Sequence, residues 1–381
     1  MDVIRGFDPE FIPSIAGPRF ETEYFGADVD EVIVVETSDA ARAYPVPILD
    51  LHHMVNDAID GTPVVVTWCP LCGSGVVYDR TVEGRTLTFE FAGKLADNNF
   101  VMRDRETGTE WKQSTGEALS GELEGERLDI RSARMTTYDE FVSDYPDGVT
   151  LARPDGNDPY LFYRFETVAT TLLSHPAGQE ALDGISHLVR AANLARDPET
   201  GTSDVSVRPF YRIMQGGVEL SDWLRGRGTD DQAVTYDGKP MALYEGSRVF
   251  GFPPVHGGSR EWDGGNADLR AKTRVLGLVV NGDAVGVPYS RVESAGGLVT
   301  TTVGGTDVVV VADDGELAAY EAPGFELTPT ADGTLEGDGT RWDATTGESE
   351  DGRALTRQPG RWTFAFSWQS DHGIDSFYDA A

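Results

Sequence analysis

The segment that most constrains the fold of this chain is residues 64–79, which hold both cysteines of the protein. A β-branched run at residues 64–67 enters the segment, and Val76-Val77 leaves it. Between them stands Cys-Pro-x-Cys-Gly, in which proline and glycine favour a tight turn. The pattern therefore predicts a β-hairpin whose tip carries two thiols, Cys69 and Cys72.

Three interpretations of this tip are open. A metal knuckle would aim both sulfurs at one point, as zinc and iron–sulfur sites require. A redox pair of the thioredoxin kind would place its first thiol at a helix N-terminus, which lowers the thiol pKa. Here Gly73-Ser74-Gly75 and a strand pattern follow Cys72, so that helix is missing. In the third interpretation, the two cysteines are buried small hydrophobic residues that brace the hairpin.

A metal knuckle supplies two ligands, and a closed site needs about four. His53 precedes the cysteines by about one hairpin, and neutral imidazole is a common partner of two thiolates on zinc or copper. We expect Cys69, Cys72 and His53 to hold a Zn, Cu or Fe ion, with a fourth position from solvent, Met102 or an acid. An open fourth position would favour metal-assisted redox or hydrolysis, and a filled one a structural role.

Further side chains of the first half are candidates for a polar pocket around this site. Some could orient His53 through a hydrogen bond, although turns and helix caps use the same residue types. Met102 would be a soft ligand if the metal is copper, and otherwise a core residue. The candidate pocket residues are His52, Asn56, Asp57, Asn98, Met102, Asp104, Trp111 and Gln113.

The charge balance excludes two classes of partner. Asp and Glu total 64 against 31 Lys and Arg, which gives a net charge of −33. Such an excess argues against nucleic acid and against an anionic membrane surface. The acidic residues are spread along the whole chain, which indicates adaptation to a high-salt cytoplasm of the haloarchaeal type, where salt screens the self-repulsion. Neither an apolar run of membrane-spanning length nor a signal peptide is visible, so we expect a cytoplasmic protein.

Local patterns predict several elements of the first half. Residues 32–35 read as a buried strand. Residues 40–47 continue as its hairpin partner, at a sheet edge because of their prolines. Leucine and β-branched residues at a spacing of four predict a helix over Leu49 to Ile59. Residues 98–103 predict a strand, and residues 138–145 a short amphipathic helix.

An internal repeat extends this reading to the whole chain. Three motifs recur in the same order: residues 32–45 resemble 275–288, residues 61–66 resemble 305–310, and residues 111–117 resemble 342–348. The second copy has lost the cysteines, since Asp313-Asp314-Gly315-Glu316 stands at the tip. We predict a mainly β (α+β) protein with two tandem related β-rich domains, 1–150 and 246–381, joined by a connector with a helical insertion at 151–245.

These motifs also carry a family resemblance. The chain resembles the DUF3179 family, which is functionally uncharacterised, over nearly its whole length except an insertion around 174–250. The first-half residues that carry the resemblance are Ala43-Tyr44-Pro45, His53 to Asp57, Thr67 to Ser74, Gly93-Lys94-Leu95, Asn98, Met102 to Thr107 and Trp111-Lys112-Gln113. Looser matches follow at Asp158-Pro159-Tyr160, residues 271–277 and residues 342–347. The resemblance implies a motif set but no established reaction.

Two rivals to the metal site come from other functional classes. One is a metal-free thiol–disulfide oxidoreductase that uses Cys69 as nucleophile on a small-molecule or protein thiol substrate. The other is a non-enzymatic binding module with structural cysteines.

Overall fold

The computed structural model describes residues 3–5, 12–24, 26, 28–38, 40–70, 72–97, 99–152, 154, 268–269, 272–313, 315–330 and 332–379. The chain divides into two compact units. The first comprises Met1–Tyr24, Asp28–Arg153 and Asp237–Ala381, and so contains both repeats. The second comprises Phe25–Ala27 and Pro154–Tyr236, and almost all of it lies outside the described residues. Almost all of the predicted connector, residues 151–245, and of the insertion lies outside the described residues, so the three-domain division stays a prediction.

The first repeat is mostly β. Its strands are β1 (Val3–Arg5), β2 (Phe20–Glu21), β3 (Glu31–Glu36), β4 (Ala41–Pro45), β5 (Met54–Ile59), β6 (Thr62–Cys69), β7 (Ser74–Asp79), β8 (Thr81–Val82), β9 (Arg85–Thr86), β10 (Phe89–Ala96), β11 (Asn99–Asp104), β12 (Glu110–Lys112), β13 (Ala118–Ser120), β14 (Arg134–Thr137) and β15 (Val149–Leu151). Two short helices, α1 (Val46–His52) and α2 (Tyr138–Asp144), join them. The mainly β class is therefore confirmed.

The second repeat is built in the same way. Its strands are β16 (Arg274–Val280), β17 (Asp283–Pro288), β18 (Leu298–Val303), β19 (Thr306–Asp313), β20 (Glu316–Glu321), β21 (Thr328–Pro329), β22 (Thr334–Gly337), β23 (Thr340–Asp343) and β24 (Arg361–Phe364). Its helical elements are α7 (Tyr289–Ser294), α8 (Ala365–His372) and the 3-10 turn Ile374–Ser376. No helix among the described residues is long and apolar enough to cross a membrane.

Element order confirms the internal repeat. In each copy two antiparallel strands lead through a proline into a short helix, and three antiparallel strands follow. The series β3-β4-α1-β5-β6-β7 in the first copy thus corresponds to β16-β17-α7-β18-β19-β20 in the second. Each copy then closes with a strand that pairs with its own first strand and leads into a helix, as β14-α2 and β24-α8.

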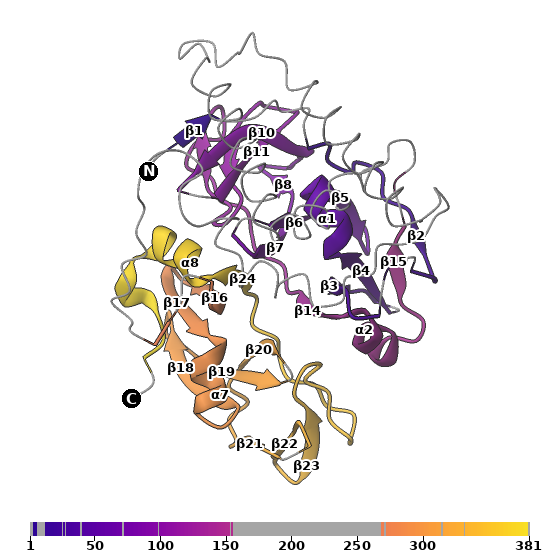
Figure 1. Cartoon of the computed structure of the whole chain (residues 1–381), viewed down its shortest axis with the longest axis vertical. Coiled ribbons are helices and arrows are strands. Elements are labelled where there is room, and N and C mark those ends of the chain that lie inside the picture. The colour runs from indigo at the N-terminus through magenta and orange to yellow at the C-terminus, as the bar shows by residue number, and fades with distance from the viewer. Residues whose placement is uncertain are drawn as a thin grey trace, which may run out of the picture. The chain divides into compact units, whose positions relative to one another are not determined.

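The two repeats share a sheet. Its strand order is β17-β16-β24-β7-β6-β5, so β24 of the second repeat pairs with β16 on one side and β7 on the other (Figure 1). In return, β14 of the first repeat lies against β20 of the second. The second repeat therefore adds a paired strand to the first repeat's three-stranded unit, and the first repeat places β14 in contact with the last strand of the second repeat's unit.

Two local expectations were wrong. The helix α1 ends at His52, and His53 takes a left-handed conformation (φ 57°), after which β5 begins, so no helix runs from Leu49 to Ile59. The strand β4 lies inside its sheet, between β3 and β15, and not at an edge. Its prolines are tolerated because Pro45 ends the strand and Pro47 stands in the first turn of α1, where no backbone donor is needed.

Other local expectations are confirmed. The buried run at residues 32–35 forms β3, residues 99–104 form β11, and residues 138–144 form α2 with a capping box on Thr137. The cysteine segment forms the hairpin β6–β7, in which β6 is covered on both sides by β5 and β7. Because β6 is central, its run of valines is fully buried.

Candidate functional site

The tip of the β6–β7 hairpin is where the two thiols meet. The strand pairing ends with Cys69 opposite Ser74, and the amide of Cys72 donates to the carbonyl of Cys69 at 3.2 Å. In the second repeat the corresponding hairpin closes with Asp313 opposite Glu316, so only two residues form its turn. The first repeat thus has a turn that is two residues longer, and Cys72 lies in that extra length.

The two sulfur atoms face each other. Cys69 Sγ and Cys72 Sγ are 2.7 Å apart, and no disulfide bond joins them. Their exposed fractions are 1% and 0%. Burial raises the pKa of the Cys72 thiol well above its usual range, and the neighbouring Cys69 adds to this rise. Cys72 is therefore a protonated thiol at neutral pH, held against the other sulfur.

The second repeat covers this tip. The amide of Phe364, at the end of β24, donates to the carbonyl of Cys72 at 2.9 Å. Gly73 takes a positive φ of 55°, and a Cβ at this position would lie 2.7 Å from the Phe364 ring. Only glycine fits both the conformation and the close approach. The Cys-Gly part of the motif is thus shaped by contact with β24.

His53 lies beside the hairpin in an aromatic setting. Its backbone carbonyl accepts from the amide of Trp68 at 2.8 Å, and its ring packs near Phe91 and Phe100 at centroid distances of 6.2 and 5.3 Å. Burial lowers the pKa of His53 to about 3, so the ring is neutral at pH 7. Its buried Nδ1 has no hydrogen-bond partner among the described residues.

The distance between the two sulfurs can be compared with the distance that a shared metal ion would require. Two thiolates on one tetrahedral zinc lie about 3.7 Å apart, because Zn–S bonds are about 2.3 Å long. The sulfurs of Cys69 and Cys72 are closer than this, at 2.7 Å. Within the part of the chain that the structure describes, no three His, Cys, Asp or Glu side chains form a group that could hold a metal. The Zn, Cu or Fe site with His53 stays a prediction.

Three of the predicted pocket residues do lie with the thiols. Met102 and Trp111 are fully buried in the same core cluster as both cysteines and pair across β11 and β12. Gln113 clamps the hairpin, since its Nε2 donates to Thr67 Oγ1 at 2.9 Å and to the carbonyl of Ser74 at 3.2 Å.

The other predicted pocket residues have local structural partners. Asp104 accepts from the indole nitrogen of Trp111 at 2.9 Å and caps the turn that follows β11. The side-chain amide of Asn56 exchanges two hydrogen bonds with the backbone of Phe89. Asp57 accepts from Tyr44 at 2.6 Å and also pairs with an arginine of β4.

The two remaining candidates add nothing to the thiol site itself. His52 Nδ1 lies 2.7 Å from the carbonyl of Pro13 and therefore donates to it. Asn98 lies outside the described residues.

Sequence reasoning missed a buried ion cluster next to the thiols, formed by Lys112, Arg361 and Asp371. The carboxylate of Asp371 lies 2.7 Å from Lys112 Nζ and 2.8 Å from Arg361 Nη2. Burial alone would raise the pKa of Asp371, but the two cations outweigh burial and hold it below its usual value. A signal for this cluster was present in the sequence: an arginine is followed ten residues later by an aspartate in both repeats. Arg361 and Asp371 form this pair in the second repeat, and Arg134 and Asp144 form it in the first, at 2.5 Å.

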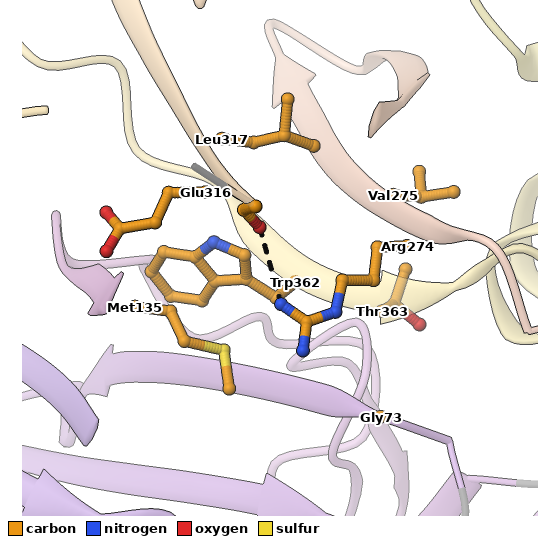
Figure 2. A pocket seen from close by; sticks show the side chains of 9 residues that line it. Gly73, Met135, Arg274, Val275, Glu316, Leu317, Trp362 and Thr363 are labelled. Carbon is orange, nitrogen blue, oxygen red and sulfur yellow. Dashed lines mark hydrogen bonds between the residues drawn. The ribbon is translucent and has the colours of Figure 1, made fainter. Parts of the chain in front are cut away.

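A small cavity lies beside the hairpin tip, at the seam between the repeats. Its volume is about 20 Å³, which is enough for one water molecule. Figure 2 shows Gly73 at one side of it, with Glu316 and Trp362 across the opening and Arg274 donating to the carbonyl of Gly315 at 3.4 Å. This cavity adjoins the residue that follows Cys72.

Comparison with known proteins gives one match. Residues 9–192 and 228–375 match the model of a family described as "Protein of unknown function (DUF3179)". No curated protein and no solved structure was found to match the chain. The first matched region contains most of the first repeat, and the second contains most of the second repeat. The residues between the two matched regions, 193–227, lie outside the described residues.

Proposed function

We propose, from the premise that this chain belongs to the DUF3179 family of proteins of unknown function, that its first repeat carries a dithiol–disulfide redox site. The site consists of Cys69 and Cys72. The observation that carries the proposal is the 2.7 Å distance between the two thiol sulfurs, which need to approach by less than about 1 Å to form a bond of about 2.05 Å.

The reaction is a two-electron oxidation of the pair. An oxidant of the peroxide class accepts two electrons and two protons from the thiols, so an S–S bond forms while the O–O bond breaks and water leaves. A low-molecular-weight disulfide would oxidise the pair with two thiols as leaving groups, but it would reach the buried sulfurs only if the tip opened. The raised pKa of Cys72 keeps that thiol protonated, which favours Cys69 as the attacking sulfur and Cys72 as the resolving one.

Burial supports a small oxidant over a protein substrate. Both sulfurs are covered, and the cavity beside Gly73 admits a molecule of about the size of water. Peroxide is of this size, whereas a protein disulfide could reach Cys69 only if the tip opened away from Phe364. The site therefore suits a sensor of oxidants or a two-electron store better than a general disulfide exchanger.

The experiment is a redox titration of the purified chain. The protein is equilibrated with dithiothreitol buffers of graded potential, quenched with acid, denatured and alkylated with a maleimide, and its mass is read. We expect one two-electron transition that adds two labels when reduced and none when oxidised. Cys69→Ser and Cys72→Ser are matched controls, and each should carry one label at every potential.

Two results would overturn the proposal. One is a folded protein that keeps both thiols at the most oxidising potential and also after exposure to hydrogen peroxide, the small oxidant class that the burial favours. The other is stoichiometric metal that purifies with the chain, disappears in Cys69→Ser and blocks disulfide formation, which would favour the metal site instead. The test thus separates the redox site from both of its rivals, because structural cysteines would give the first result.

A further inference from the structure

The hairpin tips of the two repeats differ in their buried polar side chains as well as in their thiols. Tyrosine hydrogen bonds identify one pair of equivalent positions. The hydroxyl of Tyr78 donates to the carbonyl of Gln113 at 2.8 Å in the first repeat, and the hydroxyl of Tyr320 donates to the carbonyl of Ala344 at 3.0 Å in the second. An alanine in the second repeat therefore stands where the first repeat has a glutamine.

Strand pairing identifies a second pair of equivalent positions. Ser74 opens β7 opposite Cys69, and Glu316 opens β20 opposite Asp313. The second repeat thus forms the same kind of hairpin without the glutamine, the serine or the thiols. The glutamine and the serine are therefore not needed to build the hairpin, and they occur only in the repeat that carries the two cysteines.

The side-chain amide of Gln113 lies over the thiol face of the hairpin. Its Nε2 donates to Thr67 Oγ1 at 2.9 Å and to the carbonyl of Ser74 at 3.2 Å. Thr67 precedes Cys69 by two residues, so their side chains leave β6 on the same face. The Thr67 hydroxyl spends its own hydrogen on the carbonyl of Val76, at 2.8 Å, and can only accept from the amide. The nitrogen of the amide therefore faces the hairpin, and its oxygen is the end that remains.

Two buried polar atoms at this tip have no hydrogen-bond partner among the described residues. They are Gln113 Oε1 and Ser74 Oγ, and both residues are 0% exposed. Ser74 is directly opposite Cys69, and the Cβ atoms of such a pair lie about 4.5 to 5.5 Å apart on one face of the sheet. Buried polar groups almost always have partners, because an unpaired one is costly. An acceptor and a hydroxyl are thus left open on the thiol face.

Oxidation by peroxide creates a group that can use both atoms. The sulfur of Cys69 attacks hydrogen peroxide, so an S–O bond forms while the O–O bond breaks, water leaves, and Cys69 becomes a sulfenic acid. The thiol of Cys72 then attacks the same sulfur, so the S–S bond forms while the S–O bond breaks, and a second water leaves with the proton of that thiol. Only the sulfenic acid carries an O–H donor and an oxygen acceptor, since the dithiol and the disulfide lack this oxygen.

We propose, on the basis of the redox function proposed above, that Gln113 and Ser74 hold the oxygen atom that peroxide delivers to Cys69. The sulfenic O–H donates to Gln113 Oε1, and the sulfenic oxygen accepts from Ser74 Oγ. The amide is already fixed by its bonds to Thr67 and to the carbonyl of Ser74, so it stabilises the intermediate without rearranging. The second repeat has no thiol to oxidise and keeps neither group.

The first experiment compares the rate of oxidation with its equilibrium. The second-order rate constant for hydrogen peroxide is measured by acid quench, maleimide alkylation and mass, and the midpoint potential comes from the dithiothreitol titration. Ser74→Ala should lower the rate constant about tenfold, as expected for one lost hydrogen bond in the transition state. It should leave the midpoint potential unchanged, because neither end state contains the oxygen. It should not lower the melting temperature either, since the hydroxyl has no partner to lose.

The second experiment traps the intermediate. Cys72→Ser removes the resolving thiol, so peroxide should leave Cys69 as a sulfenic acid, which a dimedone probe added with the denaturant converts into one adduct detected by mass. Adding Ser74→Ala or Gln113→Leu to this variant should lower the yield of adduct several-fold, with the loss appearing as sulfinic acid. An equal yield in all three proteins would count against the proposal.

Ser290→Ala is the matched control. Its hydroxyl is also buried without a partner among the described residues, but it lies in α7 of the second repeat, so the variant should react as the wild type does. Wild-type rate constants in both Ser74→Ala and Gln113→Leu would overturn this inference and leave the redox site intact. A wild type that forms no disulfide with peroxide would overturn the redox site and this inference with it. If Gln113→Leu fails to fold, Ser74→Ala alone decides.

Discussion

Glu316→Gln should remove a large part of the pH dependence of folding stability between pH 5 and pH 8. Glu316 opens β20, where its side chain is 11% exposed and lies 3.3 Å from Arg134 of the other repeat. Burial is the main cause that raises the pKa of Glu316 to about 8, and the Glu140 carboxyl beside it adds to the rise. The folded chain therefore keeps a proton on Glu316 that the unfolded chain releases above about pH 4.5.

The sign follows from which state binds the proton. A raised folded pKa gives stability that is complete below the unfolded value and is lost as pH rises through the folded value. The shift is about 3.5 units (8 − 4.5). Between pH 5 and pH 8 nearly one proton separates the states, so at about 1.36 kcal/mol per unit the wild type should lose about 3 to 4 kcal/mol through this group. The glutamine side chain of the variant has no proton to lose in this range.

The assay is urea unfolding of the wild type and of Glu316→Gln at pH 5 and pH 8 and at constant ionic strength. The acidic residues distant from Glu316 contribute equally to both chains, so the difference between the two curves reports Glu316 together with its hydrogen-bonded neighbour Glu140. Glu336→Gln, at an exposed position of β22, is the matched control and should run parallel to the wild type. Parallel curves for Glu316→Gln would refute the reasoning, because they would mean that the carboxyl has no proton to release in this window.

Three further outcomes are expected. Gly73→Ala should lower the free energy of unfolding in urea by about 2 to 5 kcal/mol, because the alanine is strained at positive φ and overlaps the Phe364 ring. Gly84→Ala is the control, since Gly84 has φ 74° and open space around it and should show the strain alone. Equal losses of stability in the two variants would contradict the close contact at Gly73. Asp371→Asn leaves the two buried cations of the ion cluster without their carboxylate and should lower stability by about 3 to 5 kcal/mol, which a melting curve within error of the wild type would disprove. The ring protons of His53 should titrate in NMR near pH 3, and a midpoint close to 6.5 would show that the ring is exposed to water.

The parts of the fold that local patterns encode could be predicted from the sequence. The cysteine hairpin, the buried strand β3 and the helix α2 follow from β-branched runs, turn residues and an amphipathic pattern. The prediction of a helix over Leu49 to Ile59 was wrong. Its apolar residues at a spacing of four also fit the observed arrangement, in which α1 ends at His52 and the strand β5 follows. The left-handed residue that separates them is His53, a residue type that carries no strong signal for this conformation.

The candidate site could be predicted only in part. Its two thiols, and the nearby Met102, Trp111 and Gln113, come from neighbouring strands of one repeat. The residues of the second repeat that cover the site, or that place charged groups beside it, could not be predicted from local sequence patterns. Phe364 and Arg361 reach it through the pairing of β24 with β7, which joins positions almost three hundred residues apart, and no local propensity encodes such a pairing.

The pairing of β24 of the second repeat with β7 of the first has a consequence for fragments of the chain. A fragment that ends after the first repeat would leave the Gly75 end of β7 and the hairpin tip without β24, while residues 77–79 of β7 would keep their partners at residues 129–131. A fragment of the second repeat would likewise leave β24 without one neighbour. Each half alone is thus expected to associate non-specifically with other chains. The two halves, when mixed, should pair β24 with β7 again and form a two-fragment complex.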